Sequence, residues 1–367
     1  SAKSQAAAPI RVGLPGPCFP RAYPPRGMFL VDKRGEGVLN STHGAQDLGR
    51  HRGRLGSERR VGGHAQLLTG RTLAMLFQKP SLRTRVTFEA GMAQLGGHAV
   101  YLTNDVVLGA RETVRDVARN LERFVDAIVA RTGPHEVITE LAANAGVPVI
   151  NGLSIREHPC QALADYLTIL EHRGSLNGLV LSFVGDGNNV YHSLALLGAT
   201  LGVEVRLAHP AGYAPSPRIV ERAREIAAGT GARLFFSHDP HEVVDGADVI
   251  YTDTWTSMGQ EAEAEERRDA FRAYQVNADL LARARSDAMV MHCLPAHRGE
   301  EVTAEVIDGP RSVVWDEAEN RLHVQKALME YLLLLPTWIQ LVQLKWQKSY
   351  HNKKHLRVYI NFTLNLN

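Results

Sequence analysis

The 367-residue chain has few cysteines, little surplus charge and no long apolar run. Its three cysteines are too few for a disulfide framework, so we expect a reducing compartment. The formal net charge of +2 gives no reason to expect a nucleic-acid or membrane partner. No apolar run approaches the roughly 20 residues needed to cross a bilayer. With 44% hydrophobic and 22% charged residues, the composition indicates a globular protein, and we expect it in the cytoplasm.

The N-terminal segment 1–64 also lacks a sustained helical or strand pattern. Its first 31 residues contain no acid and six prolines. Such a balance loosely resembles a transit peptide, which would place the protein in the mitochondrial matrix, but proline opposes the amphipathic helix of such peptides. We therefore expect 1–64 to be a divergent, poorly ordered segment. The tail 336–367 is also atypical, and its pattern gives it no function.

From about residue 70, short apolar runs alternate with helical segments. This alternation predicts an α/β fold of two domains, each a mostly parallel sheet flanked by helices, with long helices linking them. The expected strands are 72–77, 99–102, 127–130, 147–150, 179–184, 204–208, 233–236, 247–252, 288–292 and 312–315. The expected helices include one after Arg111 with Val114, Val117, Leu121 and Phe124 on one face, one after Pro159, and segments 216–228, 277–284 and 320–335.

The long helix after Pro159 ends near Gly174, which is a plausible domain boundary. We therefore expect a first domain over 65–173 that is completed by the final helix 320–335, and a second domain over 174–319. In parallel α/β sheets, ligands bind beyond the carboxyl ends of the strands. Functional side chains should accordingly follow directly after the apolar runs.

The junction after strand 72–77 is the strongest candidate site. A helix begins near Ser81, and Arg83, Thr84 and Arg85 fall in its first turn. Free backbone N–H groups, the positive end of the helix dipole and guanidinium groups together favour an anion such as phosphate. Ser81 and Thr84 add uncharged donors. The alternative is an ordinary capped helix with a solvated basic end.

Three further groups follow strands or begin helices. Arg131 ends strand 127–130, where it could reach a phosphate or carbonyl oxygen or could simply be a surface arginine. His158 could donate to a carbonyl oxygen or cap the helix, and Gln161 could bind an amide group. Arg321, at the start of the final helix, could be another anion contact.

The turn from Gly185 to Asn189 partly resembles the G-x-G-x-x-G dinucleotide motif. Its third glycine position is Val190, and Glu204 comes too early to bind a ribose. An NAD-dependent oxidoreductase therefore rests on this turn alone. The alternative is a tight turn that directs Asn189 toward the site.

Two further residues follow strands in the second half. Asp253 offers a carboxylate suited to an amine or ammonium group. Cys293 could be a nucleophile, a structural thiol or a polar contact for substrate, and the chain lacks the His/Asn pattern of a cysteine hydrolase. Cationic and amide groups in one half and an acid–thiol pair in the other suggest an anionic electrophile and an amine.

The combined motifs resemble the carbamoyltransferase family, and in particular its ornithine-specific branch, over about residues 66–335. Two of the motifs mark carbamoyl phosphate binding across that family, and the other two point to ornithine over aspartate. They are Ser81-Leu82-Arg83-Thr84-Arg85, His158-Pro159-Cys160-Gln161, the run from Asp253 to Ser257-Met258-Gly259, and His292-Cys293-Leu294-Pro295.

The resemblance implies transfer of a carbamoyl group from carbamoyl phosphate to the side-chain amine of L-ornithine, with no metal or organic cofactor, in a homotrimer. It implies phosphate contacts from Ser81, Leu82, Arg83, Thr84 and Arg131, and carbamoyl contacts from His158, Gln161 and Arg321. It implies ornithine contacts from Asn189, Asp253, Ser257, Met258, Cys293 and Leu294. Arg131, His158, Asp253 and Cys293 would be the catalytic residues among them.

One motif position departs from the family pattern. The family commonly has threonine where this chain has Leu82, so a hydroxyl donor is lost while the backbone N–H remains. Related enzymes for acetylated ornithine also have leucine there, so N-acetylornithine or putrescine stay open as amine substrates. A non-catalytic family member is the remaining alternative.

Overall fold

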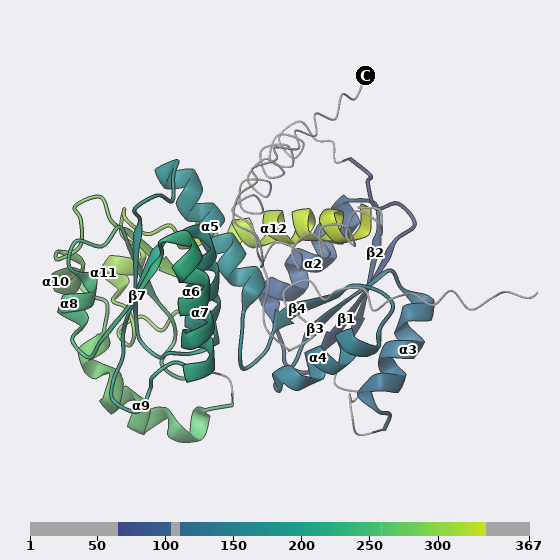
Figure 1. The fold of residues 1–367 in the computed structure, drawn as a ribbon, viewed down its shortest axis with the longest axis horizontal. Coiled ribbons are helices and arrows are strands. Elements are labelled where there is room, and N and C mark those ends of the chain that lie inside the picture. The colour runs from purple at the N-terminus through teal and green to yellow at the C-terminus, as the bar shows by residue number, and fades with distance from the viewer. Residues whose placement is uncertain (1–64, 104–110, 258, 335–367) are drawn as a thin grey trace, which may run out of the picture.

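The computed structural model describes residues 65–103, 111–257 and 259–334 (Figure 1). Within these ranges the chain forms two sheets that lie side by side, each parallel throughout and flanked by helices. This confirms the α/β class that the alternation of apolar runs predicted. The predicted tail 336–367 and leader 1–64 lie outside the described residues.

The first sheet has the strand order β2-β1-β3-β4. Its strands alternate their side chains between two apolar layers because successive residues of a strand face opposite sides. Leu73 and Met75 pack toward α2 and the last helix of the chain, whereas Ala74 and Leu76 pack toward α3 and α4. The elements are β1 Thr72–Phe77, β2 His98–Leu102, β3 Ala127–Arg131, β4 Val149–Leu153, α2 Leu82–Gln94, α3 Val114–Phe124 and α4 His135–Asn144.

The second sheet has the strand order β7-β6-β5-β8-β9 and also separates two apolar layers. The helices α6 and α7 cover one face, and shorter helices cover the other. The elements are β5 Val180–Val184, β6 Glu204–Ala208, β7 Arg233–Ser237, β8 Val249–Thr252, β9 Met289–His292, α6 Asn189–Leu201, α7 Pro217–Thr230, α8 Pro240–Val244, α9 Ala264–Phe271, α10 Ala278–Leu281 and α11 Ala304–Ile307, with 3₁₀ turns η1 Glu261–Glu263 and η2 Arg272–Tyr274.

Two long helices, α5 Pro159–Arg173 and α12 Val314–Leu334, join the halves (Figure 1). The helix α5 begins with Pro159 in its first turn and ends at Gly174, whose φ of 71° suits glycine. The helix α12 packs on α5 and on α2. Its Met329 belongs to the core of the first half and its Val324 to that of the second, so one helix stabilises both.

Three predictions about elements are wrong. Residues 312–315 do not form a strand: Ser312 makes only an isolated bridge to Val290, and α12 begins at Val314, six residues before the predicted helix. Asp316 and Glu317 in its first turn favour a helix start, which outweighs a short valine run. The helix predicted over 277–284 is limited to Ala278–Leu281. Phe124 leaves the buried face of α3 and is 72% exposed.

Candidate active site

The start of α2 presents backbone donors at the end of β1. Ser81 is the N-cap residue, with extended backbone, and its hydroxyl makes no capping hydrogen bond. The first turn holds no acidic side chain. The first N–H groups of any α-helix lack partners within the helix, and no acceptor in the described residues is recorded for those of Leu82, Arg83 and Thr84, which therefore suit an anion. The side chain of Leu82 is 73% exposed and leaves the backbone accessible.

Strand register brings Arg131 to this helix start. Phe77, the last residue of β1, pairs with Arg131, the last residue of β3. The Nη1 of Arg131 donates to the hydroxyl of the buried Thr84 at 3.3 Å. Arg321, from α12, donates to the same hydroxyl through Nη2 at 3.1 Å. Two guanidinium groups that are distant in sequence therefore converge on one threonine.

We define the arginine cluster as Arg83, Arg131 and Arg321; in the described part of the chain, none of the groups that accept its hydrogen bonds is a carboxylate. Its hydrogen-bond acceptors are the Thr84 hydroxyl, the Gln161 carboxamide and the Leu294 carbonyl. Burial, and then the charges of Arg321 and Arg83, lower the pKa of Arg131 to about 10. Burial is also the main cause that lowers the pKa of Arg321. A bound dianion would relieve both penalties.

His158 lies in the same electrostatic environment. Burial, followed by the charges of Arg321, Arg131 and Arg83, holds the pKa of His158 well below its usual value. The imidazole is therefore neutral at neutral pH and can donate a hydrogen bond without carrying charge. Among the described residues, no hydrogen-bond partner reaches the buried Nδ1 of His158 or the buried Nε atoms of Arg131 and Arg321. These are unsatisfied polar atoms of the kind that a ligand would pair.

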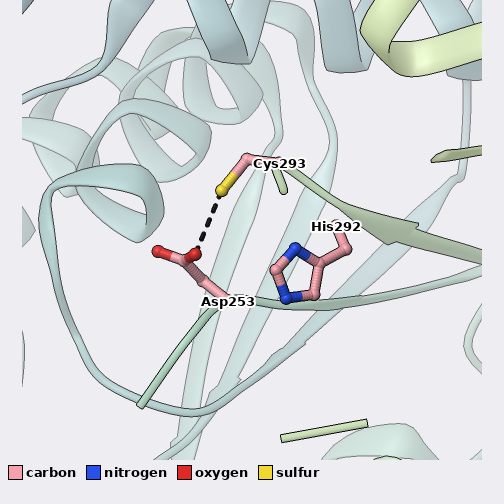
Figure 2. A group of neighbouring side chains, drawn as sticks. All are labelled: Asp253, His292 and Cys293. Carbon is pink, nitrogen blue, oxygen red and sulfur yellow. Dashed lines mark hydrogen bonds between the residues drawn. The ribbon is translucent and has the colours of Figure 1, made fainter. Parts of the chain in front are cut away.

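In the second half, strand register places an acid beside a thiol. Thr252, the last residue of β8, pairs with His292, the last residue of β9, so the next residues on the two strands are Asp253 and Cys293. The Sγ of Cys293 donates to Oδ1 of Asp253 at 3.0 Å (Figure 2). Asp253 also accepts from the backbone N–H of Thr254 and from Nδ2 of Asn188, each at 2.8 Å. The carboxylate is thus fixed in orientation and only 7% exposed.

The two halves meet through Leu294. The Nη2 of Arg83 donates to the carbonyl oxygen of Leu294, which directly follows Cys293. Leu294 has a φ of 57°, a left-handed conformation that is rare for a residue with a Cβ atom. Its N–H donates to Nδ1 of His292 at 2.8 Å, which helps to hold this conformation. Arg83 and the Asp253–Cys293 pair therefore lie close together.

Two adjacent asparagines have different partners. Asn188 caps α6 by accepting from the N–H groups of Val190 and Tyr191, and its amide donates to Asp253. Asn189 donates to the carbonyl oxygen of Ser154, which follows β4 in the first half, at 2.7 Å. The predicted ornithine contact, Asn189, thus bridges the halves in this structure. Asn188, which the sequence analysis did not select, is the one that touches Asp253.

The glycine turn packs against the chain itself. A Cβ atom on Gly187 would lie 2.3 Å from the backbone nitrogen of Pro215, and the N–H of Gly187 donates to the carbonyl of Tyr213. Glycine is required here by a close approach of backbone to backbone, which accounts for the motif without a dinucleotide.

Two groups of side chains in the described residues have the spacing of metal ligands: Asp253, His292 and Cys293, and His297, Glu300 and Glu301. In the first group, the Sγ of Cys293 donates to Oδ1 of Asp253, and burial and the charge of Asp253 raise the pKa of this thiol. The ring of His292 accepts from the Leu294 N–H through Nδ1 and contacts Glu301 through Nε2. In the second group, Glu300 is ion-paired with Arg268. Hydrogen bonds therefore account for both groups.

Two predicted ornithine contacts remain. The backbone N–H of Ser257 donates to the side chain of Gln260 at 2.9 Å. Met258 lies outside the described residues. The loop before them is held by Arg267, whose guanidinium contacts the carbonyl oxygen of Trp255 and the carboxylate of Asp186. Sequence analysis missed Arg267.

Comparison with known proteins supplies two family matches. The carbamoyl-P binding domain of aspartate/ornithine carbamoyltransferase matches residues 42–171, and the Asp/Orn binding domain matches residues 177–332. The chain belongs to the aspartate/ornithine carbamoyltransferase family. The first match begins within the segment 1–64 that the sequence analysis set apart as divergent.

Individual members of the family are similar over most of their length. The chain is 58% identical over 275 residues to an ornithine carbamoyltransferase of Pyrococcus horikoshii, which covers 75% of this chain and 87% of the relative. The solved ornithine carbamoyltransferase of Pyrococcus furiosus superposes with a TM-score of 0.79 at 51% identity, covering 84% of this chain and 97% of that one. That of Thermus thermophilus gives 0.72 at 48% identity, with 80% and 96% covered.

Proposed function

We propose that this family member transfers the carbamoyl group of carbamoyl phosphate to the side-chain amine of L-ornithine, giving citrulline and phosphate. The observation that carries the proposal is the contact between the arginine cluster and the loop that holds Asp253 and Cys293. An unbalanced cationic site beside a helix N-terminus suits a phosphorylated electrophile. A fixed carboxylate next to it suits an amine.

For the donor, we assign the phosphate group to the backbone N–H groups of Leu82, Arg83 and Thr84, with the Ser81 hydroxyl and the guanidinium groups of Arg83 and Arg131. In this assignment the donors would stabilise the negative charge that increases on the phosphate as it leaves. We assign the carbamoyl oxygen to Arg131, Arg321 and the neutral His158. The carbamoyl nitrogen would donate to Gln161, whose Oε1 has a second lone pair beyond its bond to Arg321.

For the acceptor, we assign ornithine to Asp253, Asn189, Ser257, Met258, Cys293 and Leu294. Asp253 and Cys293 would orient the reacting nitrogen, which attacks the carbonyl carbon after losing one proton. The tetrahedral intermediate then expels phosphate, which takes the electron pair of the broken C–O bond and accepts the second proton released by the attacking nitrogen. The rate enhancement comes from orientation of the reactants and from stabilisation of the negative charges that develop on the carbamoyl oxygen and on the leaving phosphate.

We further propose the arrangement of the whole protein: a carbamoyl phosphate-binding domain over 65–173, completed by the final helix, and an ornithine-binding domain over 174–319. The residues Leu328 and Met329 of α12 support the first assignment because they pack in the core of the first sheet. We propose a homotrimer located in the cytoplasm, or in the mitochondrial matrix if residues 1–31 act as a transit peptide. No helix in the described ranges is both long and apolar enough to span a membrane.

A citrulline assay on the purified chain tests the proposal. Carbamoyl phosphate is supplied with ornithine, N-acetylornithine, putrescine or aspartate in parallel reactions. We expect ornithine to give a kcat/KM at least about tenfold above that of any other amine, because only a matched site pairs both ends of its substrate. A higher value for N-acetylornithine or putrescine would move the assignment to that amine. Carbamoyl phosphate binding without turnover on any amine would indicate a non-catalytic member.

A further inference from the structure

Two acidic side chains lie buried directly behind the arginine cluster. Asp165 on α5 and Glu317 on α12 are both fully buried. The Nε2 of Gln161 donates to Oδ1 of Asp165 at 2.8 Å and to Oε1 of Glu317 at 2.9 Å. The Oε1 of Gln161 accepts from Nη1 of Arg321 at 2.7 Å. A carboxamide has two N–H donors, so both are already used within the protein.

These partners fix the orientation of the Gln161 carboxamide. Acceptors lie on its nitrogen side and a guanidinium on its oxygen side, and rotation by 180° would reverse every bond. Only Oε1 can then interact with a bound carbamoyl group, and only as an acceptor. The site would therefore recognise the N–H of a carbamoyl group and disfavour a substrate that has no N–H at the same place.

The two carboxyl groups are not equivalent. Glu317 accepts from Gln161, from the hydroxyl of Tyr251 at 3.1 Å and from the backbone N–H of His292 at 3.0 Å. Asp165 accepts only from Gln161, and no donor among the described residues reaches its buried Oδ2. Three donors stabilise an ionised Glu317, whereas Asp165 has an oxygen that is satisfied best by a proton of its own.

The charges around the pair agree with this difference. Burial, and then the neighbouring charge of Glu317, raises the pKa of Asp165 well above its usual value. Burial also raises the pKa of Glu317, while the N–H of His292 opposes that shift. Arg321 is the cation that faces the pair from α12. One negative charge next to one guanidinium is balanced, whereas two buried carboxylates would not be.

Glu317 also connects the two substrate sides. The residue after His292 is Cys293, which donates to Asp253. A single carboxylate thus holds Gln161 on the carbamoyl side and the end of β9 on the amine side.

We propose that Asp165 and Glu317 share one proton, carried by Asp165, and act as positioning residues that keep the Gln161 oxygen turned toward the carbamoyl group. The kinetic consequence rests on the proposed function; the protonation state does not. The side chains of Asp165 and Glu317 lie within hydrogen-bonding reach of each other, so the protonated Asp165 donates to Glu317 and the pair carries one negative charge in total.

Infrared spectroscopy of the wild type and of Asp165→Asn at neutral pH, compared as a difference spectrum, tests directly for the proton. The wild type should show the C=O band of a buried protonated carboxyl group, and Asp165→Asn should remove it. If the wild type lacks this band, or if Asp165→Asn keeps it, the proposal is overturned. This measurement needs no turnover, so a failure of the citrulline assay alone would refute the proposed function and leave the proton assignment standing.

Steady-state kinetics test the positioning role. Asparagine mimics a protonated aspartate, so Asp165→Asn should keep the KM for carbamoyl phosphate within about threefold of the wild type. Glu317→Gln places an amide among three donors and should raise that KM about tenfold or more, as should Asp165→Leu. Glu225→Gln makes the same change on the exposed surface of α7 and is the matched control. An Asp165→Asn enzyme as impaired as Asp165→Leu, at equal melting temperature, would contradict the proposal.

Discussion

The two halves of the molecule differ in the sign of their buried charged side chains and in the partners of those side chains. In the first half, the arginine cluster lies around Thr84 with polar but uncharged acceptors, and burial lowers the pKa values of Arg131 and Arg321. In the second half, the carboxylate of Asp253 already accepts three hydrogen bonds. A bound anion would therefore relieve unfavourable charge in the first half, whereas the carboxylate of Asp253 in the second half already has three hydrogen-bond donors. Carbamoyl phosphate, which is an anion, should therefore stabilise the folded protein more than ornithine does.

The largest effect should come from removing the cation that links the halves. Arg83→Ala deletes a guanidinium that we assign to the leaving phosphate, and turnover should fall by about 10³-fold. Citrulline formation at saturating substrates measures it. Arg119→Ala, an exposed arginine on α3, is the matched control and should retain wild-type turnover. Near-normal activity in Arg83→Ala would remove the first half from the proposed chemistry.

The next effect should separate the amine side from the anion side. Asp253→Asn keeps the shape of the side chain but removes its charge, so kcat/KM for ornithine should fall about 100-fold. The KM for carbamoyl phosphate should change little, because we assign that substrate to the other half. Initial rates with each substrate varied in turn give both values, with the exposed Asp269→Asn as control. An equal fall in kcat/KM for both substrates would contradict the assignment of the amine and the anion to separate halves.

A smaller effect should come from the asparagine that orients Asp253. Asn188→Ala removes one of its three hydrogen bonds and the cap of α6. We expect about a tenfold rise in the KM for ornithine and a loss of about 1 kcal/mol in the free energy of unfolding. Urea unfolding and the citrulline assay measure these changes. An unchanged KM together with lower stability would make Asn188 a helix cap alone.

The smallest effect concerns pH. His158 has a pKa in the folded state well below that of the unfolded chain, so between the two values the unfolded state binds more protons. Stability should therefore rise with pH up to about 6.5 and become level above it as far as this group is concerned. His158→Asn should reduce this slope. Urea unfolding at pH 5.5 and 7.5 compares the two proteins, and an equal slope would indicate that His158 is charged in the folded state.

Much of this site follows from local sequence. The helix start at Ser81, Arg131 at the end of β3, and Asp253 and Cys293 at the ends of β8 and β9 could all be predicted, since each follows an apolar run. Asp165 and Glu317 were missed, although each lies four residues from a selected residue, Gln161 and Arg321 respectively. That spacing puts them on the same helix face and was the available signal.

The sequence by itself determined that strands and helices alternate and, apart from the start of α12, where most of them begin or end, because these depend on periodicities of a few residues. Only the tertiary structure decided which of them meet. Arg83 contacts Leu294 across 211 positions, and Gln161 contacts Glu317 across 156. Such pairs follow from α12 packing against both halves, and a local pattern holds no record of that packing. The same holds for charge. Whether the arginine cluster has carboxylate partners, and whether Asp165 and Glu317 share a proton, depends on which side chains are buried together.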